Sequence, residues 1–201
     1  MIKMMKKVFA LCFVTLILAS LILSGCSKKE EGGLDVDAKA ALQTIMDNAK
    51  TAAGEDAFIP FTLDMEVTSE NCSGYLGLTD EQFKQYVMDS YTLIAAISSQ
   101  AFDLAIVKCK DYASAKEVKK LIAEGFDPAN RICAISEVAF VVDSGRFVLL
   151  GGVAKDTAEI FQKAFADYFE NDVGAVKTFF ERSGEAPAVG GGMGITYGHN
   201  D

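Results

Sequence analysis

The chain has 201 residues, half of them hydrophobic, and its 28 acidic residues outnumber the 19 lysines and arginines, giving a net charge of −9. So acidic a protein is a poor candidate for binding nucleic acid or for lying flat on an anionic membrane, because both surfaces are negatively charged. The length is sufficient for one domain with its own hydrophobic core.

The first 25 residues have the organisation of an export signal. Lysines at positions 3, 6 and 7 precede an apolar run that begins at Val8 and ends at Leu23-Ser24-Gly25-Cys26. A basic start, an apolar run and small residues before the cut are typical of a signal peptide. The run is also nearly long enough to cross a bilayer, so an uncleaved helical anchor is the alternative.

The last four residues of this segment resemble the lipobox of bacterial lipoproteins. The resemblance implies cleavage between Gly25 and Cys26, and addition to the Cys26 thiol of a diacylglycerol, which carries two acyl chains such as palmitate. Two acyl chains give a stable anchor, whereas one gives only marginal binding. We therefore expect a lipid-anchored protein on the extracytoplasmic face of the cell membrane.

The segment that follows predicts a tether and then a helix. Residues 26–33 are polar, charged and end in two glycines, which is typical of a flexible linker. From Leu34 to about Ala53 the apolar residues recur with the period of a helix that buries one face, and Gly54 ends it.

A strand and a helical turn are predicted next. Residues 61–68 alternate between apolar and polar side chains, which is the period of a strand with one solvated face. A polar loop follows. Thr79 and Gln82 have the spacing of a capping box, which predicts a short helix leading to Phe83 and Tyr86.

Two strand-strand-helix units are predicted in the second half. Residues 87–97 and 101–109 indicate an antiparallel hairpin, followed by a helix over 114–124. Residues 132–142 and 146–153 indicate a second hairpin, followed by a helix that Asp156 caps. A shift of 42 residues aligns Ile106 with Val148 and Val118 with Ile160. This suggests two copies of one unit, although the sequence identity between them is low.

The predicted architecture is a single α+β domain over residues 34–182. It contains an antiparallel sheet of about four to five strands with helices on one face. Val173, Val176, Phe179 and Phe180 predict a further helix that extends as far as Arg182. Residues 183–201 are rich in glycine and predict a disordered tail.

The pattern around Phe102 to Glu124 resembles a family of small Gram-positive lipoproteins known only as a domain of unknown function. The resemblance rests on the segment Phe102-Asp103-Leu104-Ala105-Ile106-Val107-Lys108, the helix after it and the strand Gly145 to Leu150. It spans about Leu34 to Phe169 and implies a cellular location and a fold. It implies no activity and no site residue.

The cysteines indicate neither a metal nor a redox site. After Cys12 and Cys26 are set aside, Cys72, Cys109 and Cys133 remain, without the spacing of a zinc site or a C-x-x-C motif. A disulfide between Cys109 and Cys133 is compatible with export. The alternative is that both are small buried residues.

No catalytic or metal-binding residue is predicted, and we expect no cofactor. The single histidine, His199, lies in the glycine-rich tail, where no scaffold holds it as a base or ligand. The motifs of serine hydrolases and zinc proteases are absent from the sequence. Paired carboxylates remain as candidates for a hydrolase, namely Asp64 with Glu66 and Asp80 with Glu81, but their spacing does not distinguish a catalytic pair from a solvated surface.

The sequence therefore favours a non-enzymatic binding or interaction module. Its partner would be an envelope protein or a wall component that meets the sheet face left open by the helices. Lys108 and Lys110, near the end of a strand, are the candidate surface residues. The alternative is the solute-capturing lipoprotein of a transporter, whose groove would be lined by tyrosines: Tyr75, Tyr86, Tyr91 and Tyr112.

Overall fold

The structure is a computed structural model that describes residues 35–54, 61–96, 101–130 and 135–182. The predicted signal peptide (1–25), tether (26–33) and tail (183–201) lie outside the described residues, and so do Cys26, Cys133 and His199.

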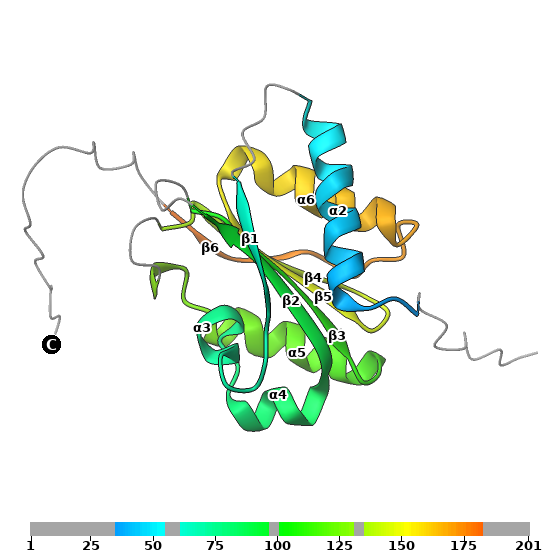
Figure 1. Cartoon of the computed structure of the whole chain (residues 1–201), viewed down its shortest axis with the longest axis vertical. Coiled ribbons are helices and arrows are strands. Elements are labelled where there is room, and N and C mark those ends of the chain that lie inside the picture. The colour runs from blue at the N-terminus through cyan, green and yellow to red at the C-terminus, as the bar shows by residue number, and fades with distance from the viewer. Residues whose placement is uncertain (1–34, 55–60, 97–100, 131–134, 183–201) are drawn as a thin grey trace, which may run out of the picture.

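Six antiparallel strands form one sheet in the order β1-β2-β3-β5-β4-β6 (Figure 1). Because every strand pair is antiparallel and helices separate the hairpins β2-β3 and β4-β5, the predicted α+β class is confirmed. The strands are β1 (Thr62–Glu66), β2 (Val87–Ala95), β3 (Asp103–Cys109), β4 (Val138–Ser144), β5 (Phe147–Val153) and β6 (Lys177–Glu181).

Four of the predicted helices are present with small changes at their ends, namely α2 (Ala38–Ala53), α4 (Asp80–Tyr86), α5 (Tyr112–Gly125) and α6 (Lys155–Tyr168). The polar segment predicted as a loop contains the short helix α3 (Cys72–Leu76), and a 3₁₀ turn, η1 (Pro128–Asn130), follows α5. The Thr79 hydroxyl and the Gln82 side chain form the predicted capping box of α4. Asp156, however, is in the first turn of α6 and not its N-cap, which is Ala154.

Helices cover both faces of the sheet, so the prediction of helices on one face is wrong. Helices α2 and α6 pack on one face, here called the α2 face, and α3, α4 and α5 pack on the other, here called the α5 face (Figure 1). Every residue of β3, β4 and β5 is buried. Their continuous apolar runs are the mark of strands covered on both sides.

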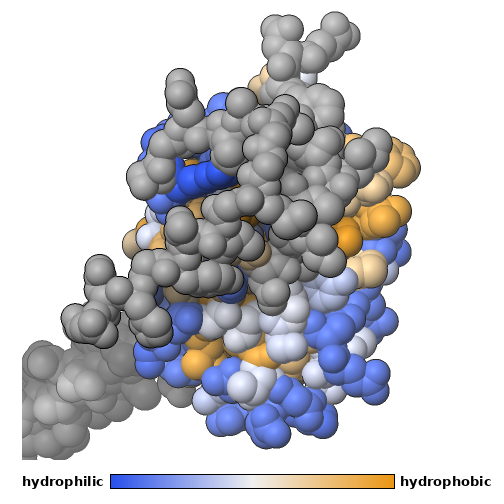
Figure 2. All heavy atoms as spheres, turned by 90° about the vertical axis from the view of Figure 1, so that its left-hand side faces the viewer, coloured by the Kyte–Doolittle hydropathy of each residue, from blue (hydrophilic) through white to orange (hydrophobic). Residues whose placement is uncertain are grey.

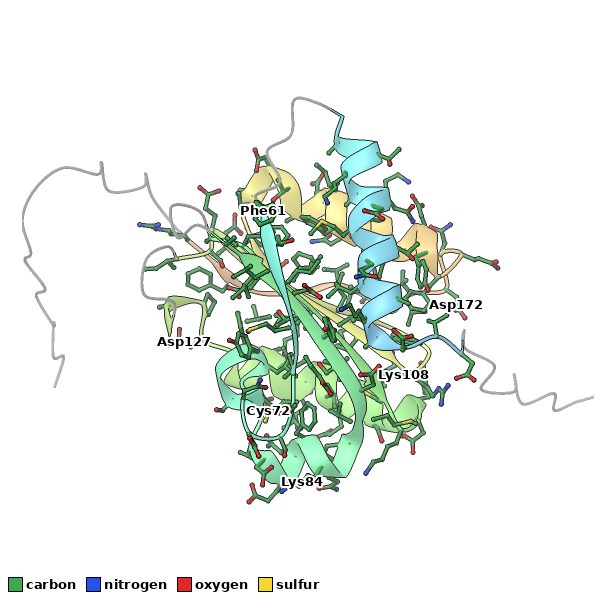
Figure 3. All side chains as sticks on the ribbon, viewed as in Figure 1. Phe61, Cys72, Lys84, Lys108, Asp127 and Asp172 are labelled. Carbon is green, nitrogen blue, oxygen red and sulfur yellow. The ribbon has the colours of Figure 1, made fainter. Side chains whose placement is uncertain are left out.

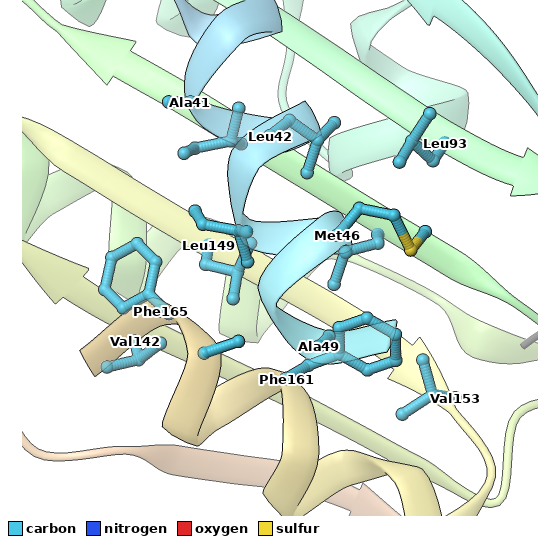
Figure 4. Packing of buried hydrophobic residues seen from close by; sticks show 14 of the residues in the cluster. Ala41, Leu42, Met46, Ala49, Leu93, Val142, Leu149, Val153, Phe161 and Phe165 are labelled. Carbon is cyan, nitrogen blue, oxygen red and sulfur yellow. The ribbon is translucent and has the colours of Figure 1, made fainter. Parts of the chain in front are cut away.

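Each face has its own hydrophobic core. On the α2 face, Leu42 and Met46 of α2 meet Phe161 and Phe165 of α6 above Leu149 of β5 (Figure 4). On the α5 face, side chains of α5 pack over the alternate residues of the same strands. Those buried α5 residues are Ala115, Val118 and Ile122.

The segment predicted as a last helix is the edge strand β6. It pairs with β4, and the register shifts by one residue between Ala139 and Phe140. Such a bulge disturbs the alternation of side chains, and the consecutive residues Phe179 and Phe180 both pack against the core of the α5 face. Because Phe179 and Phe180 are both apolar, this segment lacks the alternation of a strand, and its apolar residues recur with the spacing of a helix.

The two strand-strand-helix units are not superposable copies. The hairpins β2-β3 and β4-β5 are arranged about the central pair β3-β5, with β2 and β4 on the outer sides. A rotation that exchanges the hairpins would keep α5 and α6 on one face, yet they lie on opposite faces. The units are therefore mirror images in topology, which argues against a duplication.

Candidate interaction surface

The edge strand β1 is only partly covered by the rest of the molecule. Among the residues that the structure describes, it pairs only with β2, in a register that places Leu63 opposite Ile94 and Met65 opposite Thr92. The amide of Ala96 donates to Phe61 O, and that of Val67 donates to Ser90 O. In an antiparallel pair, alternate residues exchange both backbone bonds with the partner. The odd-numbered residues of β1 therefore bond to β2, and the backbone groups of Thr62, Asp64 and Glu66 face outward.

A row of apolar side chains lies exposed along this strand. Phe61 is 78% exposed and Leu63 is 49% exposed, and the half-buried Met65 continues the row. All three lie on the α5 face, because they pair with the β2 positions whose side chains point to that face. Figure 3 places Phe61 at the end of β1 far from Cys72 of α3 and Lys84 of α4. The helices of the α5 face thus leave the end of β1 open.

Figure 2 shows the side of the molecule at the left of Figure 1, where hydrophilic side chains gather at the lower end. Hydrophobic side chains are visible at the right-hand edge of this view and in smaller areas near the lower centre. Large exposed apolar side chains on an edge strand are unusual, because such a strand is a template for pairing with another chain.

On the α2 face, β1 is tied to α2 by charge. Lys39 Nζ lies 2.8 Å from Asp64 Oδ2 and donates to the Tyr91 hydroxyl at 3.1 Å, with the ammonium 4.8 Å from the centre of the Tyr91 ring. Hydrogen bonding to Lys39 lowers the pKa of Asp64, and the same bond raises the pKa of Lys39. These contacts hold β1 against α2, and no other described strand pairs with its outer edge.

The start of α2 is fastened to the sheet at the end of β3. The Asp37 carboxylate caps the helix by accepting from Ala40 N, and Asp89 of β2 accepts from Ala38 N at 2.7 Å. Lys108 Nζ donates to Val36 O at 2.7 Å and to Asp35 Oδ1 at 3.2 Å. The point at which the described chain begins is therefore held on the α2 face.

This arrangement changes the role of the two lysines predicted as surface residues. Lys108 is only 8% exposed, because its side chain lies under the segment that leads into α2. Lys110 is exposed, and its ammonium donates to Lys84 O at 2.7 Å. Lys108 is thus a structural contact and not part of an open surface, and the prediction that it lies on one is wrong.

One carboxylate of each candidate pair is bound to a lysine. Asp64 is bound to Lys39 as described above. Asp80 is bound to Lys84 at 2.7 Å within α4. Hydrogen bonding from Lys84 lowers the pKa of Asp80. Among the residues that the structure describes, no group of three His, Cys, Asp or Glu side chains is placed to hold a metal ion.

The tyrosines predicted for a ligand groove are distributed over different parts of the molecule. Tyr91 contacts Lys39 on the α2 face, whereas the Tyr75 hydroxyl lies 4.0 Å from Met65 Sδ on the α5 face. Tyr112 begins α5 and stacks with Lys116, and Tyr86 ends α4. These four rings therefore do not line one groove.

Cys72 and Cys109 are free and buried. Burial raises the pKa of the Cys109 thiol to about 12, so it stays protonated at neutral pH. Of the two interpretations that the sequence allows for Cys109, a disulfide or a small buried residue, the structure shows the second.

The apolar row on β1 was not recognised as a surface from the sequence. The alternation of residues 61–68 predicts the strand correctly but assigns its apolar side chains to the interior. The strand lies at the sheet edge, and that position depends on pairing with β2, which is more than twenty residues away along the chain. Local periodicity carries no signal for it.

Comparison with known proteins gave no match to a family model, to a curated protein or to a solved structure. Within the described ranges, no helix combines the length and the apolar character needed to cross a membrane.

Proposed function

We propose that the protein is a lipid-anchored envelope lipoprotein that acts as a non-enzymatic interaction module, with β1 as its contact element. Cys26 would carry the lipid, and the tether would hold the domain on the extracytoplasmic side of the membrane. The resemblance of Leu23-Ser24-Gly25-Cys26 to a lipobox supports the anchor.

The observation that carries the binding role is the exposed apolar row on an edge strand with outward backbone groups. Pairing of an extended segment with an open sheet edge is a recurring mode of protein recognition, in which main-chain bonds provide affinity and alternate side chains provide specificity. Phe61 and Leu63 would provide the apolar contacts, and the backbone of Thr62 and Asp64 would provide the hydrogen bonds.

The anchor is tested by replacing the lipidated residue. Cys26→Ser removes the thiol that accepts the diacylglycerol, so the variant should lose incorporation of a labelled fatty acid. Retention of the label would show that the anchor is elsewhere.

The contact element is tested by cross-linking on intact cells. Leu63→Lys places a charge in the apolar row and should abolish the cross-linked species seen with the unaltered chain. Met88→Lys is the matched control, since Met88 is an equally exposed apolar residue (58%) at the other end of the same sheet. Equal cross-linking of the unaltered chain and both variants would exclude β1.

A further inference from the structure

We propose that β1 pairs with β1 of a second copy of this chain, antiparallel and centred on Leu63, so that two sheets join into one. This inference rests on the proposed function, in which β1 is the contact element, and names the partner. It follows from three properties of the strand: the direction of its backbone groups, the order of its side chains and the position of α2.

The backbone allows only certain registers. Because odd-numbered residues of β1 bond to β2, an added strand must bond to Thr62, Asp64 and Glu66. In an antiparallel pair of identical strands, these residues must therefore face even-numbered residues of the second copy. Centring the pair on Leu63 meets this condition for Thr62 and Asp64, because Thr62 of each copy then exchanges both backbone bonds with Asp64 of the other. The position that faces Glu66 in this register is a proline, which has no N–H to donate.

The side chains select among the allowed registers. Centred on Leu63, the pair places Leu63 against Leu63 and Phe61 against Met65 of the second copy, which extends the apolar row across the junction. On the opposite face, the Thr62 hydroxyl meets the Asp64 carboxylate. Centring the pair on Asp64 would instead place two Asp64 side chains opposite each other, and like charges in that position are destabilising.

The symmetry of the pair agrees with two anchors in one membrane. Antiparallel edge pairing is generated by a two-fold axis perpendicular to the sheet, which leaves the same face of both copies on the same side. The chain enters α2 on that face in each copy, beside Lys108. Both tethers can then reach the same membrane. Attachment to one surface raises the effective concentration of the two strands, which compensates for a small interface.

Disulfide trapping in the full chain, expressed in its membrane, tests this register. Residues 63 and 63, and residues 61 and 65, would be non-hydrogen-bonded pairs, whose Cα atoms lie about 4.5 Å apart and within the range of a disulfide. A Cys133→Ser background is used, because Cys72 and Cys109 are already buried. Under mild oxidation, Leu63→Cys should give a cross-linked dimer.

Two further samples control for chance collision. Met65→Cys alone should give no dimer. In this register, position 65 faces position 61 of the second copy and lies four residues along the strand from position 65 of that copy. A mixture of differently tagged Phe61→Cys and Met65→Cys chains should give a dimer that carries both tags. Phe61 is largely exposed, so its replacement leaves the folded core unchanged.

The outcomes separate this proposal from the one before it. Absence of a dimer in every one of these samples, and in a mixture of differently tagged Leu63→Cys and Met65→Cys chains, overturns the pairing of two copies. A dimer that carries both tags of that last mixture, without a Leu63→Cys dimer, overturns the register alone. If no disulfide forms while Leu63→Lys still abolishes cross-linking to another protein on cells, β1 is a contact element for that protein and the second copy is excluded. If Leu63→Lys also changes nothing, both proposals fail.

Discussion

Asp143 joins three parts of the chain. It is the penultimate residue of β4, its side chain is 1% exposed, and it binds Lys116 at 2.6 Å and Lys119 at 2.7 Å, both from α5. Lys119 also donates to the carbonyl of Ala175, and Gly174 N donates to the Asp143 carbonyl at 2.7 Å. The carboxylate therefore connects the sheet to α5 and to the segment that leads into β6.

Asp143→Asn should lower the free energy of unfolding by about 2–4 kcal/mol, because it leaves two ammonium groups without their buried counter-ion. The lower end of the range reflects Lys116, which is partly exposed and can be rehydrated. Urea unfolding followed by circular dichroism measures the change. Asp167→Asn is the control, since it removes an exposed pair with Lys163 on α6 and should cost no more than about 0.5 kcal/mol. Equal effects of the two substitutions would show that the Asp143 contacts are not structural.

The same carboxylate predicts a pH dependence. Burial raises the pKa of Asp143, but the hydrogen bonds from Lys116 and Lys119 outweigh it, so that the pKa lies below its ordinary value. As the pH falls, the unfolded chain takes up the proton first. The stability that Asp143 contributes is therefore complete above about pH 4 and is lost as the pH falls through the lower pKa of the folded state.

Stability measured from pH 6 to pH 3 should consequently fall less steeply in Asp143→Asn than in the unaltered protein. Some slope will remain in the variant, because hydrogen bonds also lower the pKa values of Asp64, Asp80 and Asp111. Parallel curves for the two proteins would contradict the assignment.

At the level of the elements, α3 and α5 meet by a close approach of their backbones. Gly77 follows α3 with a φ of 69°, and a Cβ atom there would lie 2.2 Å from the carbonyl carbon of Gly125 at the end of α5. Only glycine fits, both because of the left-handed backbone and because of the contact. This junction sets how the short helices α3 and α4 lie against α5.

Gly77→Ala should reduce the free energy of unfolding by about 3 kcal/mol or more, since it adds a steric clash to the strain of a positive φ. Gly145→Ala separates the two effects. Gly145 also has a positive φ, of 54°, but nothing lies within 4 Å of its Cβ position, so strain alone should cost about 1 kcal/mol. Denaturant unfolding of both variants gives the comparison, and similar losses would mean that the clash is relieved by a small movement of α3.

The elements themselves were predictable where the periodicity of the chain is simple. The helix α2 has one apolar stripe, and the hairpin β2-β3 has two long runs of strand-forming residues, so both were predicted. The strand β6 was not, because its bulge brings Phe179 and Phe180 to the same core. The signal for helices on both faces was present in the apolar runs of β3 and β5, since a strand with one wet face would alternate.

Local sequence patterns do not predict that β1 lies at the edge of the sheet, and therefore they do not predict the candidate surface either. Leu63 has the same neighbours in sequence whether its strand is central or at an edge. Its exposure is decided by the strand order, in which β1 is the first of six. The burial of Lys108 is likewise decided by the path of the segment before α2, which is distant in sequence from β3.

At the scale of the whole molecule, the position of α2 determines how an anchored domain would face the membrane. The described chain begins at Asp35, beside Lys108 and Phe147 at one end of the sheet on the α2 face. Asp172 lies near that end, because its carbonyl accepts from Ser144. Asp127 lies at the opposite end (Figure 3), directly after Phe126, which packs on the α5 face with its ring near Gly152 of β5.

This geometry predicts that Asp172 is closer to the lipid than Asp127. The eight residues from Ser27 to Leu34 can span at most about 3.6 Å each, so a tether lipidated at Cys26 keeps Asp35 within about 30 Å of the headgroups. Energy transfer from a dye at Asp172→Cys to acceptor-labelled headgroups should therefore be more efficient than from the same dye at Asp127→Cys. Equal transfer from both positions in the lipidated protein would mean that the domain rotates freely on its tether, and that α2 does not orient it.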